Sequence, residues 1–265
     1  MSGIHVVHGK ERERVRDLPF YGGSRLPLIE AVLQGLQPGW VILNDQQDTQ
    51  FCLVLNECGF GYLCASPDYG SALKLVQSVV VEQFCLPRYF HLYEFPEASL
   101  SDIDKTRFNF RLRDRIRLLH SSAREVPVPA ESNMTVSGIS NSDLKIENKL
   151  LEGLFGFWKS PENFFQNGGY GSLVKDKNDK LLSVCFSAAS AAGLCEVDIM
   201  TSVGERSSGF GELVASHFLA TSKAVGLDVS WDCFKDNIAS HNLAKKVGFE
   251  ELISYKFLSL FKVDS

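Results

Sequence analysis

A short glycine-rich segment, Arg206-Ser207-Ser208-Gly209-Phe210-Gly211, carries the clearest chemical signal in this sequence. It leads directly into a stretch, about residues 212–225, that is predicted to be a helix ending in a left-handed cap at Gly226. Glycines let a backbone approach a ligand closely, and the free N–H groups and positive dipole end of a helix favour an anion. With the Arg206 guanidinium at its mouth, the segment is expected to hold a phosphate or a diphosphate.

The elements around this segment predict a strand–loop–helix–strand unit. The alternation over residues 196–201 is typical of a strand with one buried face, and residues 227–233 predict a second strand. The site is not a P-loop, because no Lys-Ser/Thr pair closes the segment, and it lacks the G-x-G-x-x-G spacing of a dinucleotide fingerprint. Taken alone, R-x-x-G-x-G is also compatible with an ordinary surface turn.

A family resemblance decides between these readings. Arg206-x-x-Gly209-x-Gly211 resembles the acyl-coenzyme A loop of the GNAT N-acetyltransferase superfamily. The run Asn237-x-x-Ser240-x-x-Leu243-Ala244-x-Lys246-x-Gly248-Phe249 resembles the motif that follows it in that superfamily. Glu196-x-x-Ile199-x-Thr201 and Trp231-Asp232-Cys233 are similar to a bacterial subgroup that carries an extra N-terminal half. The resemblance is strongest after Cys195, weaker over residues 133–194 and vague before them.

The resemblance implies an α/β (α+β) GNAT fold, with a mixed central sheet flanked by helices. It implies acetyl transfer from acetyl-coenzyme A to a primary amine by direct attack in a ternary complex, the acceptor being a small molecule or a protein amine. The backbone of Ile199, Met200 and Thr201 is then expected to pair with the pantetheine arm. The expected diphosphate contacts are the Arg206 side chain and the amides of Ser207, Ser208, Gly209, Phe210, Gly211 and Glu212. Asn237 and Ser240 are expected at the far end of the cofactor arm, although Asn237 equally suits a simple helix cap.

Glu196 is the candidate general base, because carboxylates on this strand often fill that role in the superfamily and burial would raise its pKa. A carboxylate hydrogen-bonded within the sheet is the alternative reading, and Asp198, with the same strand parity, is the reserve candidate. The tyrosine that many members use as general acid is replaced by Ala244. The proton would then come from water or from another group, for which Ser240, Cys233 and Tyr255 are candidates. The missing tyrosine keeps a second function open, a non-catalytic acyl-coenzyme A-binding or interaction module.

Composition excludes several other classes of function. The chain has 265 residues, 45% of them hydrophobic, and so can bury a substantial core. A formal net charge of -5 argues against nucleic acid as a partner. The seven cysteines include no C-x-x-C pair, which favours reduced thiols in a cytoplasmic protein and predicts no metal site. The charged first residues contain no apolar signal core, and no apolar run approaches membrane-spanning length.

Residues 121–133, which include two prolines, predict a linker between two domains, 1–125 and 126–265. The second domain is predicted to follow the order β-α-α-β-β-β-α-β-α-β, with one helix from Ser142 to about Trp158. The first domain shows a looser order of helix, strands, helix and strand, which a degenerate GNAT-like repeat would explain. It lacks R-x-x-G-x-G, so it is not expected to bind coenzyme A through such a loop. Its role would be structural or on the substrate side.

Polar residues alternate with mostly apolar ones just before this linker. A strand there would place five arginines, here called the arginine stripe, on one face: Arg107, Arg111, Arg113, Arg115 and Arg117. One reading is a solvated, salt-bridged sheet face. The other is a contact surface for an acidic partner or nucleic acid, which nearby acidic residues weaken.

Overall fold

The computed structural model describes residues 4–22, 26–44, 49–80, 89–123, 125, 134–145 and 148–263. The chain forms two compact units, unit 1 (Met1–Arg115 with Ser254–Ser265) and unit 2 (Ile116–Ile253). Strands β6 and β12 contribute residues to both units. The predicted domain boundary between residues 125 and 126 stays a prediction, and most of its linker (124 and 126–133) lies outside the described residues.

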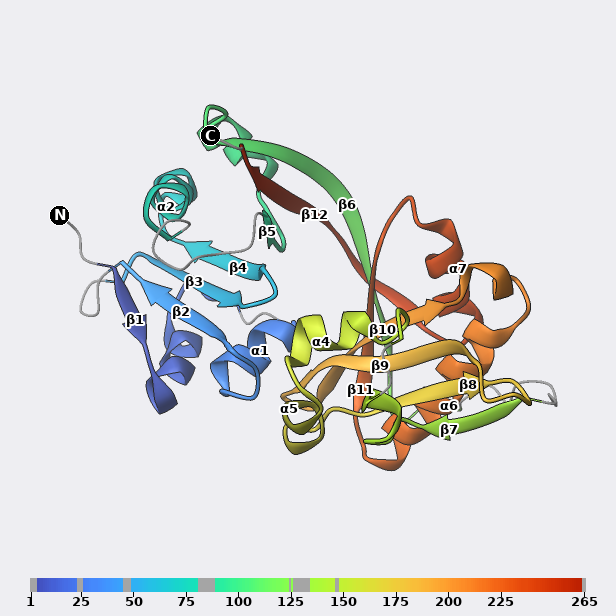
Figure 1. Ribbon diagram of the computed structural model, residues 1–265. Coiled ribbons are helices and arrows are strands. Elements are labelled where there is room, and N and C mark those ends of the chain that lie inside the picture. Colours follow the sequence, from blue (N-terminus) through green and yellow to red (C-terminus); the bar gives the residue numbers. More distant parts are fainter. Residues whose placement is uncertain are drawn as a thin grey trace. The chain divides into compact units, whose positions relative to one another are not determined.

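Unit 1 is built on a sheet in the order β1-β2-β3-β4-β5-β12-β6 (Figure 1). Its strands are β1 (His5–Val7), β2 (Gly39–Leu43), β3 (Phe51–Asn56), β4 (Phe60–Ala65), β5 (Tyr89–Leu92), β6 (Phe108–His120) and β12 (Glu250–Lys262). Its helical segments are η1 (Gly9–Asp17), α1 (Pro27–Leu33), α2 (Tyr69–Leu75), the π-helical turn η2 (Val76–Val80) and η3 (Glu97–Asp102). β4 and β5 run parallel, whereas the pairs β1–β2, β2–β3, β3–β4 and β5–β12 are antiparallel.

Local chemistry explains where the two α-helices of unit 1 begin. Pro27 occupies the first turn of α1, where its missing N–H costs no hydrogen bond, and every residue of this short helix is buried. At the start of α2, the Asp68 carboxylate accepts a hydrogen bond from the backbone N–H of Ser71 at 3.1 Å. The positive end of α2 is thus already occupied by a carboxylate of the chain itself.

The arginine stripe lies on β6 as predicted, but the solvated-face reading is wrong for two of its members. Arg115 and Arg117 are only 9% and 4% exposed. In unit 1, the Arg115 guanidinium lies 4.7 Å from the centre of the Phe257 ring, a cation–π contact. In unit 2, Arg117 forms a buried ion pair with Asp232 at 3.3 Å. Arg111, which is exposed, lies over an aromatic ring of β12. The two buried arginines of the stripe therefore both have partners within the protein.

Unit 2 contains a mixed sheet in the order β6-β11-β10-β9-β8-β7. Its remaining strands are β7 (Thr135–Gly138), β8 (Gly171–Lys175), β9 (Leu181–Ala191), β10 (Leu194–Thr201) and β11 (Asp228–Phe234). Its helical segments are η4 (Asp143–Lys145), α4 (Glu152–Trp158), α5 (Pro161–Gln166), η5 (Val203–Glu205), α6 (Phe210–Ala224) and α7 (Ile238–Lys246). β10 and β11 are parallel, and the pairs β7–β8, β8–β9 and β9–β10 are antiparallel. The predicted GNAT element order and mixed sheet are therefore confirmed.

Two hydrophobic clusters pack on the two faces of the unit 2 sheet. Successive strand residues point to opposite faces. On β10, Cys195, Val197 and Ile199 pack on the α6 side, whereas Met200 packs with α4 and α5. We call these the α6 face and the α4 face. Glu196 and Asp198 have the parity of Met200, so both carboxylates belong to the α4 face.

Several local predictions for unit 2 can be compared with the structure. α6 ends as predicted, with Gly226 at φ +74° and the N–H of Leu227 bonded to the carbonyl of Ser222. The predicted single helix from Ser142 to Trp158 is wrong, because η4 and α4 are separate segments and residues 146–147 between them lie outside the description. Five of the six cysteines that the structure describes are buried, and all six are free thiols. No described helix is long and apolar enough to cross a membrane.

Candidate active site

The parallel strands at the centre of unit 2 separate after a short paired region. β10 and β11 are in register only from Leu194 to Glu196, opposite Asp228 to Ser230. On its other edge β10 pairs with β9 over its whole length, with an irregularity between Glu196 and Val197. The backbone groups of Val197–Thr201 that face β11 therefore have no partner in that strand. The two strands leave an opening where an extended ligand could pair as an added strand.

The glycine-rich segment connects the open end of β10 to α6. Ser207 and Gly209 both adopt left-handed backbone conformations, with φ of +62° and +84°. Gly209 is the N-cap residue of α6, and no side chain caps the helix there. The N–H groups of the first turn are therefore available to an external acceptor. Arg206 is exposed and, within the described part of the chain, forms no ion pair.

Helix α7 lies close to the beginning of α6. A Cβ on Gly211 would come within 3.1 Å of the Leu243 side chain, a tight contact that would make this side chain shift by a few tenths of an ångström. Glu212, in the first turn of α6, forms a 2.6 Å ion pair with Lys246 at the end of α7. The Glu212 carboxylate is thereby paired with a lysine beside the helix end, while the backbone amides of the turn stay uncapped.

The beginning of α7 is ordered by its own side chains. The Asn237 carboxamide accepts a hydrogen bond from the Ser240 N–H at 3.3 Å, so the helix-cap reading of Asn237 is confirmed. The Ser240 hydroxyl accepts a hydrogen bond from the Trp231 indole at 2.9 Å. Because that bond uses only a lone pair, the Ser240 hydroxyl proton can still be donated.

The two candidate base residues lie on β10 at the point where the strands separate. Glu196 is buried, with 7% of its surface exposed, and Asp198 is half-buried. The Asp198 carboxylate accepts a hydrogen bond from the Ile199 N–H at 2.8 Å and lies near Gly153 of α4. Behind them, on the α6 face, burial raises the pKa of the Cys195 thiol to about 12, so this cysteine is no nucleophile.

The candidate general acids differ in their surroundings. Ala244, at the position of the usual tyrosine, is completely buried and offers no proton. Cys233 is buried at 5% exposure, and Tyr255 lies in unit 1 with its ring 6.2 Å from that of Tyr93. Ser240 is therefore the one of the three candidates within unit 2 that combines a hydroxyl with partial exposure.

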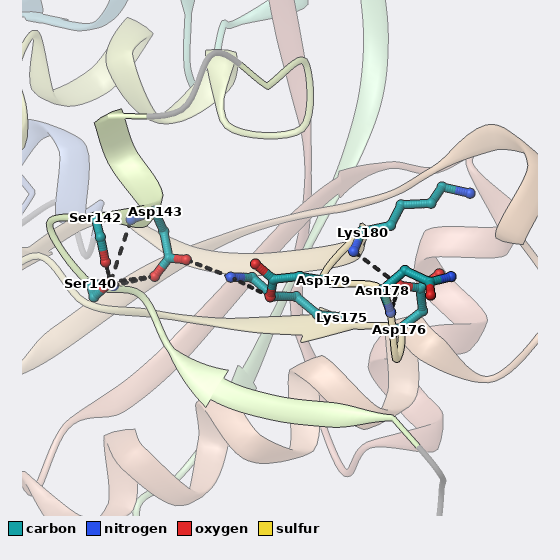
Figure 2. A network of polar contacts seen from close by, with 8 residues as sticks. All are labelled: Ser140, Ser142, Asp143, Lys175, Asp176, Asn178, Asp179 and Lys180. Carbon is teal, nitrogen blue, oxygen red and sulfur yellow. Dashed lines mark hydrogen bonds and ion pairs between the residues drawn. The ribbon is translucent and has the colours of Figure 1, made fainter.

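Two lysines of the β8–β9 hairpin form ion pairs with the segments η4 and η5. The sequence predicted neither pair. Lys180 forms an ion pair with Glu205 at 3.0 Å, joining the hairpin to the residue before Arg206. Lys175 bonds Asp143 at 2.8 Å, and Figure 2 shows this lysine between Asp143 and Asp179. Burial opposes ionisation of Asp143, but the bonds from Lys175 and from a serine outweigh it and lower the pKa of the carboxyl. No local pattern signals the pairs of Lys175 with Asp143 and of Lys180 with Glu205, because these partners lie 32 and 25 positions apart in the sequence.

The comparison with protein families gives a match over most of the chain. The profile of a family described as GNAT acetyltransferase matches residues 20–258. Over 99 residues the chain is 33% identical to an uncharacterized N-acetyltransferase, YdfB, of Bacillus subtilis (strain 168), a match that spans 37% of each protein.

Solved structures resemble the chain over nearly its full length. A GCN5-related N-acetyltransferase-like protein from Streptococcus suis superimposes with a TM-score of 0.71 at 20% identity, covering 95% of this chain and 100% of that one. A GCN5-related N-acetyltransferase from Sphaerobacter thermophilus gives 0.63 at 12% identity, with 95% and 90% covered. A tandem GNAT protein from the clavulanic acid biosynthesis pathway gives 0.61 at 12% identity, with 99% of each chain covered. At these identities the likeness concerns the fold alone.

Proposed function

Since the chain belongs to the GNAT acetyltransferase family, we propose that it transfers an acetyl group from acetyl-coenzyme A to a primary amine. The observation that carries this proposal is the opening between β10 and β11 beside an uncapped helix end. An extended arm fits the first feature and a diphosphate fits the second.

The residues present suit coenzyme A along this path. The backbone of Ile199, Met200 and Thr201 would pair with the amides of the pantetheine arm. The diphosphate would accept hydrogen bonds from the amides between Ser207 and Glu212, and the Arg206 guanidinium, which forms no ion pair within the described part of the chain, would add positive charge. Asn237 and Ser240 lie at the start of α7, where the far end of the arm would reach.

The reaction requires the acceptor ammonium to lose two protons, one before the attack and one as the amide forms, while the departing thiolate gains one, so one proton is released overall. The amine nitrogen forms a bond to the thioester carbon while the carbon–sulfur bond breaks, and sulfur keeps that electron pair. Glu196 would accept the proton from the ammonium, directly or through a water, and Asp198 is the reserve base on the same face. With Ala244 in place of a tyrosine, water or the Ser240 hydroxyl would return a proton to the thiolate. Fixing both reactants in one complex supplies much of the rate enhancement.

Unit 1 would serve the substrate side or the architecture rather than bind a second cofactor. It repeats the parallel strand–helix–strand arrangement in β4, α2 and β5, as a degenerate repeat would. However, the Asp68 carboxylate caps α2 and would repel a diphosphate there.

Calorimetry with acetyl-coenzyme A, together with coenzyme A release on a panel of amines, tests the proposal. Arg206→Ala is expected to weaken cofactor binding about tenfold, as for the loss of one charge-assisted hydrogen bond. Arg111→Ala, which removes an exposed arginine from unit 1, is the matched control and should leave the affinity unchanged. Equal affinities in both variants would contradict the site. Binding without release on any amine, peptides included, would instead favour the non-catalytic acyl-coenzyme A-binding module.

A further inference from the structure

A cavity of about 680 Å³ lies on the α4 face of unit 2, at the carboxyl end of β10. Leu151, Leu173, Leu181 and Met200 provide much of its apolar lining. Its volume is in the range of small-molecule sites, which are mostly apolar with a few polar groups that fix orientation. The cavity is therefore large enough to take part of a substrate.

The charges around this cavity are unbalanced. Among the residues that the structure describes, four cationic side chains line it and two acidic ones, Asp143 and Asp179. Lys175 forms ion pairs with both of these acids (Figure 2), and Lys180 forms an ion pair with Glu205.

Of the remaining two cations, Arg206 is assigned above to the diphosphate of the cofactor, and Lys149 forms no ion pair with any residue that the structure describes. An anion entering the cavity would thus meet the positive charge of Lys149, which no carboxylate among the described residues neutralises.

The cavity lies beside both the proposed cofactor path and the face of the candidate bases, because Thr201 and Arg206 line it together with Met200. Met200, which lines it, shares the α4 face with Glu196 and Asp198, whereas α6 and its amide-bearing first turn belong to the opposite face. At about 3.3 Å per strand residue, Met200 lies roughly 7 Å from Asp198 and roughly 13 Å from Glu196 along β10. A molecule with its amine at these carboxylates could place its other end in the cavity.

We propose that the cavity binds an anionic group of the acetyl acceptor. The acceptor is then a primary amine joined by an apolar segment to a carboxylate or phosphate roughly 7–13 Å away. The α-carboxylate of a simple amino acid, one carbon from its amine, is too close to that amine to span the distance from the candidate bases to Met200. This inference rests on the proposed acetyl transfer and adds the chemical class of the acceptor.

Two primary amines of equal chain length test the proposal. The first is ω-aminooctanoate, which carries a carboxylate at the end opposite its amine, and the second is octylamine, which carries a methyl group there. The wild-type protein is expected to show the lower KM for aminooctanoate. Lys149→Glu should raise that KM about five- to tenfold with little change in kcat, because an attraction becomes a repulsion. The KM for octylamine should not rise.

Lys177→Glu is the matched control, since this exposed lysine of the β8–β9 hairpin makes the same change of net charge but does not line the cavity. It should leave both KM values unchanged. If Lys177→Glu reproduces the effect of Lys149→Glu, the attraction is long-range and the proposed contact is overturned.

The remaining outcomes separate this proposal from the one on which it rests. Absence of coenzyme A release with every amine would overturn acetyl transfer itself. Release with equal KM values for the two amines would overturn only the acceptor class. Calorimetry with coenzyme A and 3′-dephospho-coenzyme A identifies the source of the anion without turnover. If Lys149→Glu weakens binding of the first but not the second, the cavity holds the cofactor's 3′-phosphate and our assignment is wrong.

Discussion

Replacing Gly209 with alanine tests the diphosphate loop at the position where the backbone is most constrained. Gly209 has φ +84°, and a Cβ built there meets nothing within 4 Å. The added methyl group would therefore project into open space beside the uncapped amides, where the diphosphate is proposed to lie. The same left-handed conformation costs an alanine about 1–2 kcal/mol.

The opposite end of the same helix provides the control. Gly226 has φ +74° and likewise no atom within 4 Å of an added Cβ. α6 has 15 residues, so the two glycines lie roughly 22 Å apart. Gly226→Ala should therefore cause the same strain without touching the loop.

The two variants should separate stability from binding. Each is expected to lower Tm by a few degrees, as about 1 kcal/mol shifts a domain of this size by about 2–4 °C. Only Gly209→Ala should raise the Kd for acetyl-coenzyme A, by about tenfold, which corresponds to about 1.4 kcal/mol from one lost charge-assisted hydrogen bond. Gly209→Val should raise it further. Thermal melts and calorimetry measure both quantities, and an unchanged Kd in Gly209→Ala would refute the assignment of the loop.

Three further predictions concern catalysis, the buried ion pair and pH. Glu196→Gln should lower kcat and shift the pH–rate profile while the Kd for acetyl-coenzyme A stays the same; a wild-type profile would eliminate Glu196 as the base. Arg117→Ala should lower the free energy of unfolding by about 3–5 kcal/mol in urea titrations, because it leaves the Asp232 carboxylate buried without its cation. Burial, with a smaller effect of Arg115, lowers the pKa of His91 from 6.5 to about 4. In the unfolded chain, His91 binds a proton as the pH falls below about 6.5, whereas in the folded unit it stays neutral until about pH 4. The free energy of unfolding therefore falls by about 3 kcal/mol between pH 6.5 and pH 4. We expect His91→Gln to remove this loss.

Conservative variants serve as controls for these three. Asp198→Asn removes the neighbouring carboxylate and should affect the profile less than Glu196→Gln if Glu196 is the base. Arg111→Ala removes an exposed member of the arginine stripe and should change the free energy of unfolding by less than about 1 kcal/mol. An equal loss for Arg111→Ala and Arg117→Ala would contradict the buried-pair argument. A stability curve that stays level from pH 6.5 to pH 4 would contradict the His91 argument.

The amino-acid sequence by itself determined the order of the elements of unit 2 and most of the elements themselves, the helix predicted from Ser142 to Trp158 excepted. Strand alternation, the cap at Gly226 and the Asn237 cap are local features, because each depends on residues within a few positions along the chain. The β8–β9 hairpin and the loop before α6 follow from the same kind of signal. Two motifs at the right spacing were enough to indicate the GNAT fold that the family match covers.

Only the tertiary structure decided what surrounds these elements. Strand alternation placed the arginine stripe on one face, but whether that face is solvated depends on non-local partners: the ring of Phe257 near Arg115 and the carboxylate of Asp232 near Arg117. The early end of the β10–β11 pairing is likewise a property of two strands separated by a helix. The pairing of Lys180 with Glu205 required the hairpin to meet the loop in space. Such contacts arise from packing between segments distant in sequence, and a periodic pattern within one segment carries no information about them.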